Sequence, residues 1–239
     1  MTRIHDMGGR FGDGPIPLKK IDGKVVDDEP VFKTDWHAKA FAITVASASV
    51  GKWSIDKSRF FRESLPPKDY AKFDYYEKWS SALINLLVEK GLINKNDLIE
   101  ITQKAKEDNL EVSQITDMHQ DVLKAKDVAI TLGRGGPSAR EVLDLPKFKV
   151  GQEVRTINYS PNKNIIGGHT RLPIYARGKK GKVILHHKGH VLPDASAHDL
   201  GDSPEHLYTV EFLSTELWGD KDGNQKDSIC IDLWESYLK

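Results

Sequence analysis

Two arginines, an aromatic pair and a set of histidines are the side chains in this sequence best suited to chemistry. Arg59 stands among phenylalanines, and Arg171 ends a glycine-rich run. Arginine presents a rigid fork of N–H donors that matches carboxylates and other oxyanions. Tyr75 and Trp79, four residues apart, would share one face of a helix. These types of residue indicate anion binding and the lining of a small apolar pocket.

Each of these residues also has an ordinary interpretation. An exposed Arg59 needs no partner, whereas a buried guanidinium needs an anion, and the surrounding sequence offers no obvious candidate. The run Gly167–Arg171 could cradle an anion on its backbone N–H groups. It lacks the spacing of a phosphate-binding loop that opens a helix, so a plain loop is favoured. Spacing alone likewise favours core packing for Tyr75 and Trp79 over a substrate pocket.

The histidines could hold a divalent metal only if a carboxylate joined two of them. The cluster and its acidic neighbours are His186, His187, His190 and His198, with Asp194 and Asp199. Adjacent residues of a strand face opposite sides, so surface or turn positions are favoured for these histidines. The single cysteine, Cys230, cannot form an internal disulfide or a thiolate metal site alone. Its flanking residues predict a buried strand position, and we expect no metal bound by this chain.

Composition excludes several classes of protein. The chain has 239 residues, with 35 Lys and Arg against 35 Asp and Glu. No stretch approaches the ~20 apolar residues of a membrane span, and the start has no signal-peptide pattern. We therefore expect a soluble, cytoplasmic protein. A basic hairpin at 177–183 is typical of nucleic-acid-binding barrels, but residues 146–239 hold 13 Lys and Arg against 12 Asp and Glu, which argues against phosphate binding.

The elements that must position these residues divide the chain in two. Residues 1–32 are rich in Gly and Pro and predict an extended arm that wraps a partner. Within residues 33–132, hydrophobic periodicity predicts helices from Thr34 to Gly51, over 55–65, from Asp74 to Gly91, and over 96–107 and 116–132. Thr34 or Asp35 is the expected cap of the first helix and Ser54 that of the second, which Pro66-Pro67 ends, and the third helix starts at Asp74.

Beyond a linker at 133–145 the hydrophobic period changes to two. Alternation predicts strands over 150–158, 182–186, 207–212 and 228–233, separated by turn residues. Several short strands in so few residues indicate a small β-barrel over 146–239. The predicted fold class is therefore α+β, with a helical N-terminal half, an extended arm and a C-terminal barrel.

Six blocks, in order and over nearly the whole length, resemble the β subunit of the nitrile hydratase family. They are Ile4–Gly9, Tyr75–Trp79, Gly168–Gly178, His206–Phe212, Glu216–Gly219 and Asp232–Tyr237. The chain departs from the family's pattern at Ser58 and Lys78, where an aromatic residue and a histidine are common. The resemblance implies that the barrel is of SH3-like type and that the arm and helices wrap an α subunit.

The resemblance also implies an activity, a metal and a set of site residues. Nitrile hydratases, which are lyases, convert a nitrile and water into an amide. Their non-corrin cobalt(III) or non-haem iron(III) sits in a Cys-x-x-Cys-Ser-Cys loop of the α subunit, with two oxidised cysteines. By position, Arg59 and Arg171 would bind those oxidised cysteines. Tyr75 would contact substrate or water, and Ile55 and Trp79 would line the pocket. The pattern Tyr75-x-x-x-Trp79 resembles the cobalt type.

The expected assembly is an αβ heterodimer or α2β2 heterotetramer, with no nucleic acid or membrane as partner. Alternatives are a subunit related to thiocyanate hydrolase, an assembly chaperone or activator, and a nucleic-acid-binding barrel module. In thiocyanate hydrolase the helical and barrel halves are usually separate chains, whereas here they are joined. Near-zero net charge speaks against nucleic acid.

Overall fold

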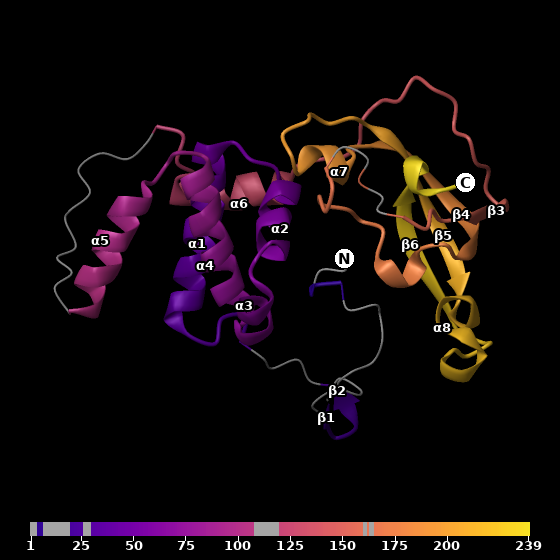
Figure 1. Ribbon diagram of the computed structural model, residues 1–239, viewed down its shortest axis with the longest axis horizontal. Coiled ribbons are helices and arrows are strands. Elements are labelled where there is room, and N and C mark those ends of the chain that lie inside the picture. The colour runs from indigo at the N-terminus through magenta and orange to yellow at the C-terminus, as the bar shows by residue number, and fades with distance from the viewer. Residues whose placement is uncertain (1–3, 7–19, 26–29, 108–119, 160–161, 163–164) are drawn as a thin grey trace. The chain divides into compact units, whose positions relative to one another are not determined.

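A computed structural model of the chain describes residues 4–6, 20–25, 30–107, 120–159, 162 and 165–239 (Figure 1). The described residues form two compact units. The first unit takes its residues from 1–9, 54–60 and 135–239, and the second from 10–53 and 61–134. The helix α2 (Ile55–Glu63) therefore begins in one unit and ends in the other. Within the described residues no helix is long and apolar enough to cross a membrane.

The second unit is helical. Its described helices are α1 (Asp35–Gly51), α3 (Pro67–Lys72), α4 (Tyr75–Glu89), α5 (Lys95–Lys106) and α6 (Ala125–Arg134). The helices α1 and α4 pack against each other, and a core forms around Trp53, Leu83 and Leu86. Leu86 is only 1% exposed. Burial of this apolar stripe, more than helix propensity, holds α4 in place.

Capping residues fix where α4 begins. The Asp74 side chain accepts a hydrogen bond from the Glu77 backbone N–H at 2.8 Å, and the Glu77 carboxylate accepts one from the Asp74 backbone N–H at 2.8 Å. This reciprocal capping box satisfies two N–H groups that the first turn of a helix leaves unpaired. At the other end Gly91 has a φ of +66°, a conformation that favours glycine and stops the helix.

The first unit contains a curled antiparallel sheet of four strands in the order β3-β4-β5-β6. Its strands are β3 (Glu153–Arg155), β4 (Lys180–His190), β5 (Glu205–Leu213) and β6 (Ser228–Trp234). After β6 the chain returns to β3, where Arg155 and Lys239 exchange two backbone hydrogen bonds of 2.8 Å. A Cβ at Gly181 of β4 would lie 2.6 Å from the Val210 side chain, so the close approach of β4 and β5 requires glycine there.

The core of this unit lies inside the curl of the sheet. Its fully buried large side chains include Leu172, Tyr208, Phe212, Leu233 and Tyr237. Short helical elements connect or follow the strands: η1 (Ile174–Ala176), α7 (Pro193–Ser196), α8 (Ser214–Asp222) and η2 (Glu235–Tyr237). The fold is thus α+β, with helices and one curled antiparallel sheet.

The predicted helices that begin after Thr34, Ser54 and Asp74 are confirmed, as is the one at 96–107. The helix expected over 116–132 is α6, which begins only at Ala125, and residues 116–119 lie outside the described part. The helix α3, which was not predicted, begins at Pro67. Proline suits the first turn of a helix, where its missing N–H would have no intrahelical partner.

The predicted strands at 182–186, 207–212 and 228–233 are confirmed and run longer, as β4, β5 and β6. The strand expected over 150–158 is reduced to the three residues of β3. A small hairpin, β1 (Lys20–Ile21) and β2 (Lys24–Val25), lies in the segment predicted to be extended. Its turn places Asp22 and Gly23 at positive φ, as a two-residue hairpin turn requires.

The prediction that Cys230 is buried is wrong, because its side chain is exposed. In β6 the residues on either side, Ile229 and Ile231, pack against the core, so Cys230 points the other way, opposite Glu211 of β5. The apolar run Ile-Cys-Ile therefore follows the ordinary two-residue alternation of a half-buried strand.

Candidate functional site

Arg59 lies on α2, whose beginning is fixed within the first unit. The Ser54 hydroxyl accepts a hydrogen bond from the Lys57 backbone N–H at 3.1 Å and donates one to the Ser196 carbonyl at 3.0 Å. The predicted cap is therefore confirmed, and the same side chain ties α2 to the last residue of α7. The Lys57 ammonium, almost wholly buried, contacts the Asp199 carboxylate at 2.5 Å.

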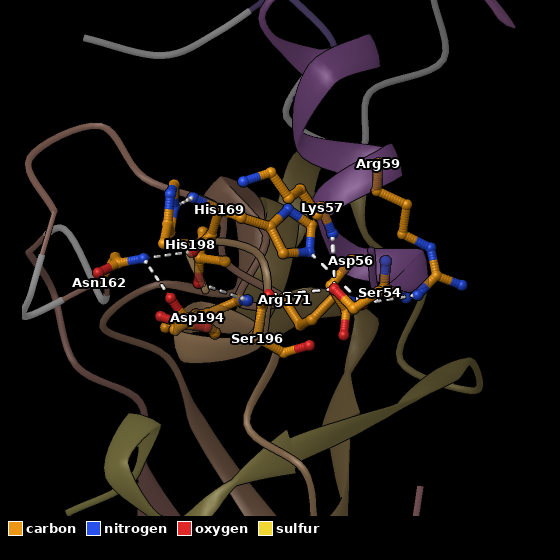
Figure 2. A network of polar contacts seen from close by, with 12 residues as sticks. Ser54, Asp56, Lys57, Arg59, Asn162, His169, Arg171, Asp194, Ser196 and His198 are labelled. Atoms are coloured by element: carbon orange, nitrogen blue, oxygen red, sulfur yellow. Dashed lines mark hydrogen bonds and ion pairs between the residues drawn. The ribbon is translucent and has the colours of Figure 1, made fainter. Parts of the chain in front are cut away.

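The Arg59 guanidinium pairs with a carboxylate of its own helix. Its Nη1 donates to Asp56 Oδ1 at 2.8 Å (Figure 2). The side chain of Arg59 is 37% exposed and that of Asp56 is 10% exposed. The expectation that no anionic candidate lies near Arg59 is thus wrong, because the three-residue helical spacing brings Asp56 beside it. A guanidinium has five N–H donors, so this contact leaves others for a second anion.

Arg171 lies at the end of the glycine-rich loop, and its side chain is exposed. Its backbone N–H donates to the Tyr237 hydroxyl at 3.2 Å. Upstream, the amide nitrogen of Asn162 donates to the His169 carbonyl at 2.8 Å and to the Asp194 carbonyl at 3.1 Å. These hydrogen bonds hold the loop through its backbone atoms. None of them involves the guanidinium of Arg171.

A close approach explains one glycine of this loop. A Cβ at Gly168 would lie 2.6 Å from Nδ2 of Asn162 and 2.8 Å from Nε2 of His198. The same imidazole nitrogen of His198 is 3.0 Å from the His169 backbone nitrogen and accepts its hydrogen. A larger residue than glycine at position 168 would displace the two side chains that hold the loop. The glycine thus positions the loop, and no anion contact by its backbone is needed to explain it.

The segments that carry the two arginines meet at Asp56. His169, two residues before Arg171, is 1% exposed, and its Nε2 lies 4.0 Å from Asp56 Oδ1. Figure 2 shows His169 directed toward Asp56, with Arg59 on the far side of that carboxylate. The first unit therefore brings the Arg59 and Arg171 segments together, although they are 112 positions apart in the chain.

Tyr237 anchors the Arg171 loop on a buried carboxyl group. Its hydroxyl donates a short hydrogen bond to Asp194 and accepts one from the Thr170 hydroxyl at 3.3 Å. Burial raises the pKa of Asp194 to about 6, against the opposing effects of the Tyr237 hydrogen bond and of His169. Burial and the neighbouring Asp194 also raise the pKa of Tyr237 well above its usual value. This network is electrostatically costly when Asp194 is charged.

The raised pKa of Asp194 predicts a pH dependence of stability. The folded chain binds this proton more tightly than the unfolded chain, so the stabilisation is complete below about pH 4 and is lost as pH rises through about 6. A shift of this size corresponds to on the order of 3 kcal/mol. We therefore compare the free energy of unfolding of the native chain with that of Asp194→Asn. The difference between the two should fall by on the order of 3 kcal/mol between pH 4 and 8. Urea unfolding at several pH values measures the difference, and a pH-independent difference would contradict the assignment.

The predicted pocket residues lie in different units. Ile55, on the first unit, is 64% exposed, and Tyr75, on the second, is 61% exposed. The Tyr75 and Trp79 rings lie 5.5 Å apart, and the Arg62 guanidinium lies 4.7 Å from the centre of the Trp79 ring. The interpretation of Tyr75 as a core residue is wrong, because its ring is largely exposed at the start of α4.

The histidines do not gather into a metal site. His186 and His187 have separate partners: Nε2 of His186 is 3.1 Å from Nδ1 of His206, and Nε2 of His187 is 2.6 Å from the Thr209 hydroxyl. Among the residues that the structure describes, no group of three His, Cys, Asp or Glu is placed to hold a metal ion. Burial and the neighbouring histidines lower the pKa of His186.

Three residues of this network were missed as site residues from the sequence. Asp56 was detectable, because it lies one helical turn before Arg59 on a predicted helix. Asp194 was considered only as a metal ligand, and Tyr237 only within a matching block. No local pattern pairs Asp194 with Tyr237, since they lie 43 positions apart.

Comparison with known proteins places the whole chain in one family. Residues 1–128 match the model of the nitrile hydratase beta subunit, N-terminal family, and residues 137–239 match that of the C-terminal family. The chain belongs to the nitrile hydratase beta subunit family. The match of both halves in their order also agrees with the sequence resemblance.

Relatives within the family are similar over their full length. The cobalt-containing nitrile hydratase subunit beta of Pseudonocardia thermophila is 35% identical and is covered to 96%, with 100% of this chain aligned. The low-molecular weight cobalt-containing subunit beta of Rhodococcus rhodochrous is 36% identical over 100% of this chain and 99% of its own. The nitrile hydratase subunit beta of Pseudomonas putida is 34% identical over 100% and 99%.

A solved structure of recombinant apo thiocyanate hydrolase from Thiobacillus thioparus aligns with 53% of this chain and 98% of its own. The identity is 21% and the TM-score is 0.37. A superposition of this extent supports no conclusion about fold or function.

Proposed function

We propose that this chain is the β subunit of a nitrile hydratase and completes, with a metal-bearing α subunit, a site that hydrates nitriles to amides. The observation that carries the proposal is the full-length similarity to curated β subunits, at 34–36% identity for three of them. The convergence of the Arg59 and Arg171 segments supports it. The two arginines that resemble the family's anion-binding residues thus lie on segments held within one unit.

Arg59 and Arg171 are proposed to bind anionic groups of the α subunit, namely its oxidised cysteines. Both side chains are at least partly exposed, and only one end of the Arg59 guanidinium is engaged by Asp56. When an oxyanion is buried at a protein interface, charge-assisted hydrogen bonds from a guanidinium offset its desolvation. The two arginines would therefore stabilise the oxidised cysteines and hold them in a fixed orientation.

Tyr75, Trp79 and Ile55 are proposed to form this chain's side of the substrate pocket. Two of these three side chains are large, apolar and exposed in the chain by itself, which is typical of surfaces that a partner covers. A small nitrile would pack against the Trp79 and Ile55 side chains. The Tyr75 hydroxyl would orient the substrate or the attacking water by a hydrogen bond.

The metal of the complex is proposed to be cobalt, held by the α subunit. Two of the relatives are named as cobalt-containing, and the Tyr75-x-x-x-Trp79 pattern agrees with that type. Such a metal supplies Lewis acidity to a nitrile or to a bound water. The part of this chain that the structure describes offers no ligand set for it. The contribution of this chain would be to bind anions, position substrate and exclude water.

The type of barrel, the N-terminal arm, the assembly and the cellular location are part of the same proposal. The hydrogen bonds between Arg155 and Lys239 join the two ends of the sheet, which supports an SH3-like barrel over 146–239. An arm over 1–32 would wrap the α subunit in an αβ heterodimer or α2β2 heterotetramer. The interface would exceed roughly 2,000 Å², as is usual for permanent complexes. The single exposed cysteine suits a reducing, cytoplasmic location.

The proposal is tested by co-expressing this chain with an α chain that contains Cys-x-x-Cys-Ser-Cys, in medium supplied with cobalt or with iron. Purification uses a tag on this chain only. We expect the α chain and cobalt to co-purify and the complex to form acrylamide from acrylonitrile, with no comparable turnover of thiocyanate. A stable chain that ignores the α subunit would contradict the proposal and favour an assembly factor, whereas thiocyanate turnover would favour the related hydrolase.

A further inference from the structure

Asp56, on the same helix as Arg59, faces His169 of the Arg171-bearing loop (Figure 2). It is 7% exposed, its Oδ1 accepts from Arg59 Nη1 at 2.8 Å, and the same oxygen lies 4.0 Å from His169 Nε2. A carboxylate this far from water is stabilised chiefly by nearby cationic or hydrogen-bonding groups. Its position is therefore coupled to the orientation of the Arg59 side chain.

The backbone around Asp56 is anchored independently of this ion pair. Ser54 caps the helix and bonds the Ser196 carbonyl, and Lys57 contacts Asp199. With the first turn of α2 fixed in this way, Asp56 presents its carboxylate from a fixed point. The Arg59 chain has several rotatable bonds, and a charged hydrogen bond at one end of the guanidinium restricts them.

The contact engages only Nη1 of Arg59, which is the end of the fork nearest Asp56. The guanidinium is planar, so fixing one nitrogen and the helix backbone leaves a small range of directions for the others. In Figure 2 the remaining guanidinium nitrogens of Arg59 point away from Asp56. An arginine restrained in this way loses less entropy when it binds an anion than a freely rotating one does.

We propose that Asp56 is a positioning residue for the hydration reaction, which holds the Arg59 guanidinium so that its remaining N–H donors meet an oxyanion of the α subunit. The inference rests on the proposed function and adds a residue to it. Asp56 itself touches neither substrate nor metal. Its role is to act through Arg59, in the way that residues behind a reactive group fix the orientation of that group.

A solely structural role for Asp56 would give a different set of results. Asp199 provides the matched comparison, because it pairs with the same helix one residue further on, through Lys57, whereas Asp56 pairs with Arg59. Its backbone has a φ of +57°, which asparagine tolerates, so Asp199→Asn removes one charge without a change of shape. Asp56→Asn makes the same chemical change next to Arg59.

The experiment compares the αβ complex with Asp56→Asn, Asp199→Asn, Arg59→Lys and the double variant Asp56→Asn/Arg59→Lys. We expect Asp56→Asn to lower kcat by about 10- to 100-fold with KM changed less than about 3-fold. Asp199→Asn should keep kcat within about 3-fold. In the Arg59→Lys background, Asp56→Asn should lower kcat by less than about 3-fold more, because the residue through which it acts is already lost.

A second measurement needs neither the metal nor turnover. In the ¹⁵N-labelled full-length chain, the Arg59 Nε–H signal is assigned by its loss in Arg59→Lys, and its heteronuclear NOE reports side-chain mobility. We expect this NOE to fall in Asp56→Asn and to stay unchanged in Asp199→Asn. An unchanged NOE together with an unchanged kcat in Asp56→Asn would overturn the proposal.

The positioning role of Asp56 and the proposed function can be contradicted separately. If the unaltered complex hydrates nitriles while Asp56→Asn is as active as Asp199→Asn, the positioning role is wrong and the proposed function stands. If Asp56→Asn lowers kcat equally with and without Arg59, the residue acts on stability or folding and not through Arg59. If the unaltered chain forms no active complex, the proposed function itself is wrong. The NOE of the Arg59 side chain would then still show whether Asp56 restrains it.

Discussion

Replacing Arg59 by lysine is expected to leave the αβ complex assembled and to lower kcat for nitrile hydration by about 100-fold. Lysine keeps the positive charge, but its ammonium cannot bind Asp56 and an oxyanion at the two ends of one planar fork. Steady-state kinetics with acrylonitrile and the metal content of the purified complex provide the measurement. The metal content should stay close to one atom per αβ pair, as roughly one site per α subunit implies.

Arg140→Lys is the matched control for this change. Arg140 pairs with Asp202 at 2.6 Å on an exposed part of the first unit, so the same substitution there should change kcat by less than about 2-fold. Full activity of Arg59→Lys would remove Arg59 from the site. Failure to assemble would show that the arginine contributes to the interface more than to turnover.

Tyr75→Phe is expected to keep the fold and to lower kcat by about 100-fold. The ring of Tyr75 is 61% exposed, so the loss of its hydroxyl should change the free energy of unfolding by less than about 0.5 kcal/mol. If the hydroxyl orients substrate or water, its removal acts on turnover and leaves the helix intact. Kinetics of the complex and thermal unfolding of the purified chain check the two halves of this expectation.

The neighbouring tyrosine offers a matched control. Tyr76 stacks on His37 with ring centres 4.8 Å apart, and phenylalanine preserves that contact. Tyr76→Phe should therefore keep kcat within about 3-fold. Equal losses of activity in the two variants, or a clear loss of stability in Tyr75→Phe, would show that the hydroxyl of Tyr75 has no special part in the reaction.

Local patterns were sufficient to predict most elements of the fold. The cap at Ser54 rests on side-chain chemistry within three residues and is confirmed, whereas Thr34 precedes α1 without a side-chain capping hydrogen bond. The alternation in β6 reflects one face packed on the core, so its position could be predicted without knowledge of its partners. The register of β4 against β5, with its irregularities near His186, depends on the partner strand and could not be predicted.

The site was only partly predictable for the same reason. Arg59 and Arg171 were selected by resemblance, and nothing in their spacing indicates that Asp56 and His169 bring their segments together. Cys230 was misplaced because two isoleucines beside it were taken as a buried run, whereas both face the core and Cys230 does not. Contacts between distant segments are set by the tertiary fold and not by the local sequence.

A crystal structure of the αβ complex would show directly whether this chain completes a site by presenting two arginines to anions of its partner. We predict that Arg59 and Arg171 each donate at about 2.7–2.9 Å to oxygens of the oxidised cysteines of the α subunit. Asp56 should keep its contact with Arg59 in that structure. Arginines directed into solvent, or an α subunit bound to a different face of this chain, would contradict this role of the two arginines.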